Sequence, residues 1–327
     1  MNNLQAASAV LMVRPISFGF NEQTAVTNTF QNHPDISQEE LHTRANQEFD
    51  TMVNGLRDQG IHVTIFEDAS KQRKPDAVFP NNWFSAWPDG KIFLYPMATE
   101  SRRIERSLVA LDDLTENFVI KQIADTSEVE KHGLALESTG VMIFDHINKI
   151  AYGCVSPRCD AGLFVSHASE LGYKPILFHS YGTDGTAIYH TNVMMGVQST
   201  TAVICAESIT DETERVLVLN TLQETGHEVV EITQAQMSAF CGNVLELQNN
   251  EGERCLTLSQ AAFDSFTNEQ KAVLHKDKIL MPFSISTIET VGGGSVRCML
   301  GEIFLPRRYA NTLMKVSNTA HKTPALA

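Results

Sequence analysis

The sequence predicts an α/β fold built from five copies of one structural unit that close into a ring. Segments with helical periodicity end at a glycine and lead directly into a short β run at least three times. Five apolar segments with one polar or reactive residue each are centred on residues 82, 137, 190, 243 and 298, which are 53 to 55 residues apart. In a ring, these five residues converge on one pocket; coincidental spacing of unrelated β runs is the alternative.

The first helix–glycine–strand unit begins near residue 37. Ser37 lies three residues before Glu40, which is a capping-box spacing, and Ile36 and Leu41 can form a hydrophobic staple around it. An apolar stripe at intervals of three and four residues then predicts one buried helical face, formed by Leu41, Ala45, Phe49, Met52, Val53 and Leu56. We expect this helix to stop at Gly60 and a strand to follow over residues 61–66.

Two later segments have the same organisation. In residues 156–178, Ser156 is the expected helix cap, Pro157 suits the first turn, and Gly172 precedes a β run. Residues 211–232 contain a second such helix, which is expected to stop at Gly226. A further helix is predicted within residues 96–108.

Composition limits the classes of partner. The chain has 327 residues, a net charge of −14, 43% hydrophobic and 20% charged residues, and no extended basic run, which disfavours nucleic acid and anionic membranes. The N-terminal residues lack the features of a signal peptide, so we expect a cytoplasmic protein with a small-molecule ligand. Six cysteines without a CxxC pair predict neither a disulfide framework nor a zinc site.

The five converging residues include the groups of a nucleophilic enzyme. Cys298 is the strong nucleophile among them, and His190 can act as acid and base near neutral pH. Glu137 lies in an apolar run, where a carboxylate requires a cationic or histidine partner. Each has a plain alternative: a buried structural thiol, a core or surface histidine, and a carboxylate in a turn formed by residues 138–140.

Arginines at two predicted helix starts indicate an anionic ligand. Arg158 and Arg102 lie where a cation opposes the helix dipole, and either guanidinium could bind a substrate carboxylate through two parallel hydrogen bonds. Solvated arginines on helix surfaces are the alternative, particularly for Arg103 and Arg106.

Together these pieces resemble the pentein superfamily of enzymes that modify guanidino groups, and more closely the CtlX group of citrulline-utilisation hydrolases. The matching stretches run through almost the whole chain: "FGFNEQTAVTNTFQ", "PDAVFPNN", "SRRIE", "LESTG", "VSPRCD", "IYHTNVMMG", "CGNVLEL" and Cys298. The resemblance implies a five-bladed α/β-propeller of pseudo-fivefold ββαβ repeats, formed by residues 1–327 as a single catalytic domain. It also implies cysteine-dependent chemistry without a metal or an organic cofactor.

The resemblance assigns roles to individual residues. Cys298 matches the nucleophile, His190 the acid/base and Glu137 the carboxylate that supports it. Arg102 and Arg158 match the arginines that bind the α-carboxylate of the substrate, and Asp76 matches a ligand-binding aspartate. We expect Asn243, at the equivalent position of the remaining repeat, to face the same pocket.

The departures from the family pattern concern substrate charge. Asn81 and Asn82 stand where dimethylarginine hydrolases have a Glu-Asp pair, and Asn192 replaces the aspartate of the deiminase "HxD" motif. An asparagine keeps an acceptor and adds donors but carries no charge, so it suits a neutral ureido group better than a guanidinium. We therefore expect hydrolysis of citrulline to ornithine, carbon dioxide and ammonia.

Other readings stay open. The same Cys-His-Glu residues would serve a guanidine deiminase or an amidinotransferase, and a non-catalytic amino-acid-binding protein is the alternative outside enzymes. A homo-oligomer is possible. The "ESTG" sequence, in place of the family's "EGG", leaves open how closely the backbone at Ser138 approaches the ligand. Gly292, Gly293 and Gly294 are expected to let the backbone pass close to the substrate.

Overall fold

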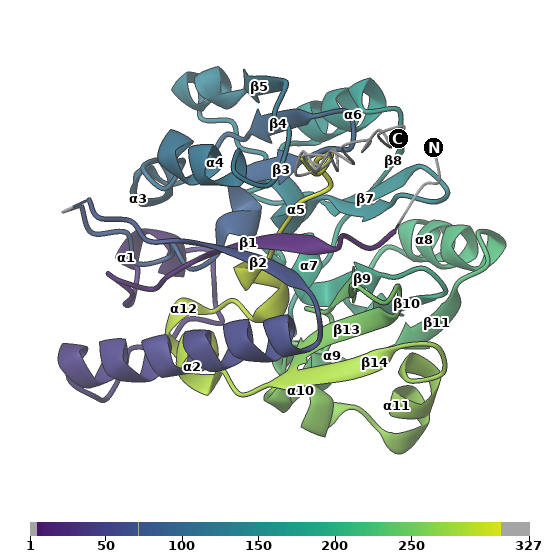
Figure 1. The fold of residues 1–327 in the computed structure, drawn as a ribbon. Coiled ribbons are helices and arrows are strands. Elements are labelled where there is room, and N and C mark those ends of the chain that lie inside the picture. Colours follow the sequence, from purple (N-terminus) through teal and green to yellow (C-terminus); the bar gives the residue numbers. More distant parts are fainter. Residues whose placement is uncertain (1–4, 71, 309–327) are drawn as a thin grey trace, which may run out of the picture.

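The computed structural model describes residues 5–70 and 72–308, which form a mixed α/β fold (Figure 1). Its described strands form five sheets of three strands each. In hydrogen-bonded order, the sheets are β15 (Gly301–Glu302), β1 (Ala9–Val13) and β2 (His62–Phe66); β3 (Phe84–Ala86), β4 (Lys91–Leu94) and β5 (Gln122–Asp125); β6 (Ile143–Asp145), β7 (Ile150–Cys154) and β8 (Lys174–Phe178); β9 (Met195–Val197), β10 (Thr201–Ile204) and β11 (Glu228–Glu231); and β12 (Leu245–Gln248), β13 (Arg254–Ser259) and β14 (Ile279–Phe283).

All five sheets share one topology. The first two strands pair antiparallel, and the second and third pair parallel, with helices in the crossover. The crossover helices are α2 (Gln38–Asp58), α3 (Glu100–Arg103), α4 (Leu108–Leu114), α6 (Ala161–Glu170), α8 (Glu212–Glu224), α10 (Gln260–Ser265) and α11 (Asn268–Leu274). This is the expected ββαβ unit, and in the first sheet the antiparallel partner of β1 is β15, from the other end of the described chain.

Consecutive sheets lie against one another. β3 contacts β15, β6 contacts β9, and short bridges join Ala86 to Ile303 and Ala7 to Leu247. A Cβ at Gly196, in β9, would lie 3.0 Å from Val244, immediately before β12. These contacts join four pairs of sheets, and in Figure 1 the purple β1 and the yellow C-terminal segment meet near the centre of the view.

The first helix confirms its sequence signals. The Ser37 side chain accepts a hydrogen bond from the Glu40 amide at 3.2 Å, and the whole predicted apolar stripe of α2 is buried. Gly60 follows the helix with φ +82, and Gly226 follows α8 with φ +86, both in the left-handed region that favours glycine. Local capping and stop signals therefore set these two boundaries.

Two expectations about local structure are wrong. The helix after residue 156 begins at Ala161 and is capped by Asp160, whose side chain accepts from the Leu163 amide at 2.9 Å, so Ser156 is not its cap and Arg158 precedes the helix. The five polar residues do not lie within strands either. They occupy tight turns that immediately precede the first strand of each sheet.

Short helical segments supply these turns and the remaining loops: α1 (Glu22–Ala25), α5 (Ser138–Val141), α7 (Thr191–Met194), α9 (Gln234–Ser238), α12 (Ser286–Gly292), η1 (Pro80–Asn82), η2 (Ser127–His132), η3 (Ala206–Ser208) and η4 (Val296–Met299). All six cysteines are buried and none is in a disulfide. No helix in the described ranges combines the length and hydrophobicity needed to cross a bilayer.

Candidate active site

The turns before the first strand of each sheet bring the predicted residues together. Asn82 ends η1, Glu137 and His190 immediately precede α5 and α7, Asn243 lies two residues before β12, and Cys298 lies in η4. η1 packs against η4 and α5, and α5 packs against α7. The turns that hold Asn82, Glu137, His190 and Cys298, which come from separate repeats, thus lie against one another.

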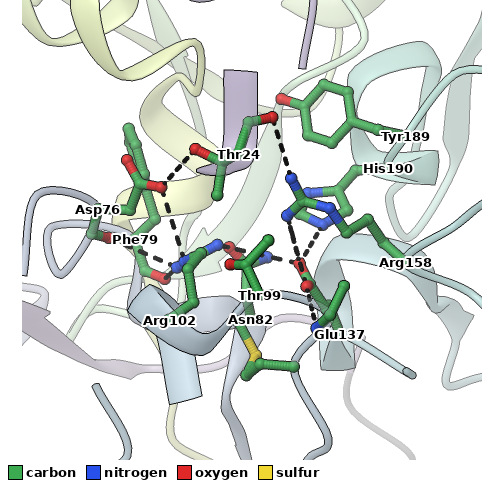
Figure 2. Close-up of polar contacts among 12 residues, drawn as sticks. Thr24, Asp76, Phe79, Asn82, Thr99, Arg102, Glu137, Arg158, Tyr189 and His190 are labelled. Carbon is green, nitrogen blue, oxygen red and sulfur yellow. Dashed lines mark hydrogen bonds and ion pairs between the residues drawn. The ribbon is translucent and has the colours of Figure 1, made fainter. Parts of the chain in front are cut away.

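Glu137 and His190 form a buried pair. His190 Nε2 lies 2.7 Å from Glu137 Oε2, and the Ala98 amide donates to Glu137 Oε1 at 3.0 Å (Figure 2). Arg158 Nη1 donates to Glu137 Oε2 at 3.1 Å. This arrangement fixes the imidazole through Nε2 and leaves Nδ1 directed toward Gly140, where an added Cβ would lie 3.1 Å from it.

The pair holds a carboxylate and a neutral imidazole. Burial raises the pKa of Glu137, but Arg158, the His190 hydrogen bond and Arg102 outweigh it and lower that pKa below its ordinary value. Burial lowers the pKa of His190 to about 4, although Glu137 opposes the shift. At neutral pH His190 is therefore a base that is ready to accept a proton.

Two asparagine amides surround the Cys298 thiol. Asn243 Nδ2 lies 3.3 Å and Asn192 Nδ2 3.5 Å from Cys298 Sγ. The Asn243 amide is fixed, because its Oδ1 accepts from the Arg297 backbone at 3.0 Å and its Nδ2 also donates to the Asn192 carbonyl at 2.9 Å. Both amides can donate to a thiolate without supplying a formal charge.

Cys298 is a protonated thiol in the resting site. Burial raises its pKa above the ordinary value of 9.0, against the opposing hydrogen bonds of the Ser295 backbone, Asn243 and Asn192. A neutral imidazole and a neutral thiol thus share the site, so the thiol must lose its proton during the reaction rather than beforehand.

Arg102 fixes the orientation of the Asn82 amide. Its Nη1 donates to Asn82 Oδ1 at 2.7 Å (Figure 2), which turns Asn82 Nδ2 toward Gly140. A Cβ at Gly140 would lie only 2.3 Å from that nitrogen, so glycine is needed for the close approach. Asn82 Nδ2 is buried and has no hydrogen-bond partner among the described residues.

Other predicted ligands also present unpaired polar atoms. Asn192 Oδ1, Asp76 Oδ1 and both amide atoms of Asn81 are buried without a partner in the described part of the chain. Asp76 Oδ2, by contrast, accepts from Asn21 at 2.8 Å and Thr24 at 3.0 Å. Buried polar atoms are normally paired, so this concentration marks a ligand site.

Arg158 connects the site to the N-terminal segment. Its Nη2 donates to Thr27 Oγ1 at 2.8 Å, and its guanidinium lies 5.7 Å from the centre of the Tyr189 ring. Sequence reasoning missed Thr24, Thr27 and Tyr189, although residues 18–31 carry part of the family resemblance. No local signal identifies them, because Thr27 and Arg158 are 131 residues apart.

The glycine triplet packs against protein. A Cβ at Gly292 or Gly294 would lie 2.7 or 2.9 Å from the Phe79 ring, and one at Gly293, where φ is +62, would lie 2.6 Å from Gln31. Gln31 Nε2 also donates to the Gly292 carbonyl at 3.0 Å. The structure thus explains these glycines by contacts between segments of the chain.

Comparisons with known proteins agree with this geometry. Residues 14–305 match the family described as N,N dimethylarginine dimethylhydrolase, eukaryotic. A search of curated proteins finds no match. Among solved structures, ArgZ, an arginine dihydrolase from the ornithine-ammonia cycle in cyanobacteria, has a TM-score of 0.70 and 14% identity over 91% of this chain and 41% of its own.

Two further structures extend the comparison. An Asn→Ser variant of the ArgZ N-terminal domain, covalently bound to a reaction intermediate, has a TM-score of 0.70 and 14% identity, over 91% of this chain and 98% of that domain. A Cys→Ser variant of DDAH from Pseudomonas aeruginosa, complexed with citrulline, has a TM-score of 0.63 and 11% identity, over 93% of this chain and 100% of its own. The family match over most of the chain and the buried Cys, His and Glu site lead to one conclusion: the protein belongs to the dimethylarginine dimethylhydrolase family of the pentein superfamily.

Proposed function

We propose that the protein hydrolyses the ureido group of citrulline to ornithine, carbon dioxide and ammonia through a covalent Cys298 intermediate. The observation that carries this proposal is the buried Asn82 Nδ2, a donor with no acceptor among the described residues. Arg102 holds this nitrogen toward the His190 side of the site. A ureido group offers a carbonyl oxygen to such a donor. A guanidinium has only N–H donors and would leave Asn82 unpaired at a cost of about 1–3 kcal/mol.

The polar atoms near the thiol also suit a neutral group. Asn192 Oδ1 is a buried acceptor that can accept a hydrogen bond from a ureido N–H, and the two side chains that hydrogen-bond to Cys298 Sγ in the described part of the chain are uncharged amides. Glu137, the carboxylate that holds His190, is already bound by Arg158 and the Ala98 amide. A guanidinium at Cys298 would have no free carboxylate among these contacts, and burying it without one is costly.

The proposed reaction begins with proton transfer from Cys298 to neutral His190 as the substrate fills the site. The thiolate attacks the ureido carbon, and Asn82 donates to the oxygen as it gains negative charge. The C–N bond to one nitrogen breaks, and His190 returns its proton to that leaving nitrogen. His190 then takes a proton from water, the hydroxide attacks the carbonyl carbon, and the C–S bond breaks as His190 returns the proton to Cys298 Sγ. The carbamic acid product separates into carbon dioxide and the nitrogen that had not yet left, as ammonia or ornithine.

The amino-acid end of the substrate would lie away from the thiol. Asp76 Oδ1 can accept from the α-ammonium group, because it is a buried carboxylate oxygen without a partner among the described residues. Arg158 can bind the α-carboxylate by exchanging its hydrogen bonds to the neutral Thr27 hydroxyl. Residues 21–31 would then cover this end of the site. We also propose that the five sheets close into the five-bladed propeller.

Arginine dihydrolysis is the second candidate. ArgZ is an arginine dihydrolase, and an Asn→Ser variant of its N-terminal domain is covalently bound to a reaction intermediate. An enzyme of that kind would release ornithine from arginine as well as from citrulline. The absence of a free carboxylate next to Cys298, among the side-chain contacts described, favours citrulline as the better substrate.

Parallel incubations with citrulline and arginine test the proposal. Wild type should release equal amounts of ornithine and ammonia from citrulline, and Cys298→Ala should release none. Ammonia from arginine without turnover of citrulline would overturn it, whereas ornithine from both at similar kcat/KM would indicate the dihydrolase.

An Asn82→Asp variant tests the reasoning behind the choice of substrate. It keeps the shape of the side chain but replaces the Nδ2 donor by a carboxylate oxygen. Citrulline turnover should fall and arginine turnover should rise relative to wild type. A uniform loss on both substrates would contradict the assigned role of Asn82.

A further inference from the structure

Glu105 lies outside the predicted site but is buried beside it. Its side chain is 1% exposed and forms an ion pair with Arg102, whose side chain is 3% exposed. Arg102 Nη2 lies 2.8 Å from Glu105 Oε2, and Arg102 Nε lies 3.1 Å from both carboxylate oxygens. One edge of the guanidinium is therefore held by a carboxylate through charge-assisted hydrogen bonds.

The other groups of Arg102 complete a rigid connection. Nη2 also donates to the Phe79 carbonyl at 3.0 Å, while Nη1 donates to Asn82 Oδ1 at 2.7 Å. The guanidinium is planar, so holding its Nε–Nη2 edge also determines where Nη1 points. Glu105 and Phe79 thus set the direction from which Arg102 Nη1 donates to Asn82 Oδ1.

We infer that Glu105 is a positioning residue that, through Arg102, determines which amide atom Asn82 presents to the substrate. This inference rests on the proposed ureido hydrolysis. The two ends of an asparagine amide have nearly the same shape, so packing alone does not decide between them. A guanidinium on one side does, because its N–H groups can donate to Oδ1 but not to Nδ2, which leaves Nδ2 facing the reacting group.

Loss of this connection has a specific chemical consequence. If the Asn82 amide rotates, Oδ1 faces the ureido oxygen and repels the negative charge that develops there. The interaction is strongest in the transition state, so kcat should fall more than KM rises. A residue that instead served capture of the α-carboxylate would act mainly on binding of substrates that carry that carboxylate.

A Glu105→Gln variant tests the inference. The glutamine NH₂ group would face the guanidinium N–H groups, so Arg102 must shift away from its present position. Glu130→Gln is the matched control, because Glu130 lies nearby, pairs with Arg106 at 2.5 Å and is 11% exposed, but does not bond to Arg102 or Asn82. Melting temperatures show whether each variant is folded, and Glu105→Asp, which restores the charge, should recover part of the rate.

The substrates are citrulline and its decarboxylated analogue, N-carbamoylputrescine. Glu105→Gln should lower kcat by about tenfold on both, with KM within a factor of two to three, while Glu130→Gln stays close to wild type. A loss confined to citrulline and to KM would assign Glu105 to carboxylate capture and overturn the inference. Equal rates for both variants would also overturn it.

The outcome for wild type separates this inference from the proposed function. If wild type turns over arginine and not citrulline, the proposed function fails, and the two variants are measured on arginine and its decarboxylated analogue agmatine. An equal kcat loss for Glu105→Gln on that pair would still support a positioning role. A loss on arginine alone would refute it.

Discussion

Gly140→Ala tests whether the close approach of Asn82 and His190 is required for turnover. Gly140 lies in α5, outside the left-handed region, so alanine fits the backbone there and even favours a helix by up to about 1 kcal/mol. Its Cβ would lie 2.3 Å from Asn82 Nδ2 and 3.1 Å from His190 Nδ1. Because real Cβ contacts essentially never fall below 3.0 Å, one partner must move by about 0.7 Å, the difference between 2.3 and 3.0 Å.

Asn82 cannot easily make that movement. Its Oδ1 is held by Arg102 at 2.7 Å, and Arg102 is held by Glu105. A displacement of about 1 Å at a reacting centre can cost on the order of 100-fold in rate, so we expect kcat to fall by that order.

Steady-state release of ornithine, with the melting temperature measured in parallel, checks this prediction. Gly162→Ala, in α6, is the matched control, since the nearest atom to its Cβ would be Asp160 Oδ1 at 3.3 Å. The control should retain wild-type turnover. A Gly140→Ala enzyme with kcat within twofold of wild type would refute the proposed geometry.

Three further changes have distinct expected results. Glu137→Gln removes the carboxylate that Arg158 contacts at 3.1 Å in a buried site. Chemical denaturation should therefore show a free energy of unfolding lower by about 3–5 kcal/mol, and turnover should fall sharply. Unchanged stability would argue against this ion pair. The rate at which iodoacetamide alkylates the free enzyme, measured against Cys298→Ser as the blank, should rise with pH up to and beyond pH 9, because burial raises the pKa of Cys298. A rate that reaches a plateau below pH 8 would reveal a preformed thiolate. Ser138→Gly should leave stability nearly unchanged, because relief of the φ of +43 offsets loss of the 2.8 Å bond to the Phe84 carbonyl; a loss above about 2 kcal/mol would contradict that balance.

Local signals predicted much of the fold. The Ser37 cap, the apolar stripe of α2 and the glycine stops at 60 and 226 are properties of adjacent residues, and the structure confirms them. The repeat period also placed Asn82, Glu137, His190, Asn243 and Cys298 at equivalent positions, since one topology recurs in all five sheets. It did not reveal that these residues lie in turns, because an apolar run before a strand resembles the strand itself.

Contacts between distant segments could not be predicted. The sequence predicted the cap of α6 at Ser156, whereas the structure places it four residues later, at Asp160. Thr24 is 52 residues from Asp76, and only the fold brings them to 3.0 Å. Glu105 lies within a recognised motif, yet its importance depends on the direction of the Arg102 guanidinium, which no sequence pattern records.

Mass spectrometry of acid-quenched protein after brief incubation with citrulline tests the central claim most directly. Attack by Cys298 predicts a covalent adduct that maps to the peptide containing this residue and disappears in Cys298→Ala. A carbamoyl group on the sulfur would show that ornithine leaves first, and an ornithine chain joined to the sulfur through a carbonyl group would show that ammonia leaves first. Turnover of citrulline without any adduct on Cys298, or with full activity in Cys298→Ala, would contradict the account.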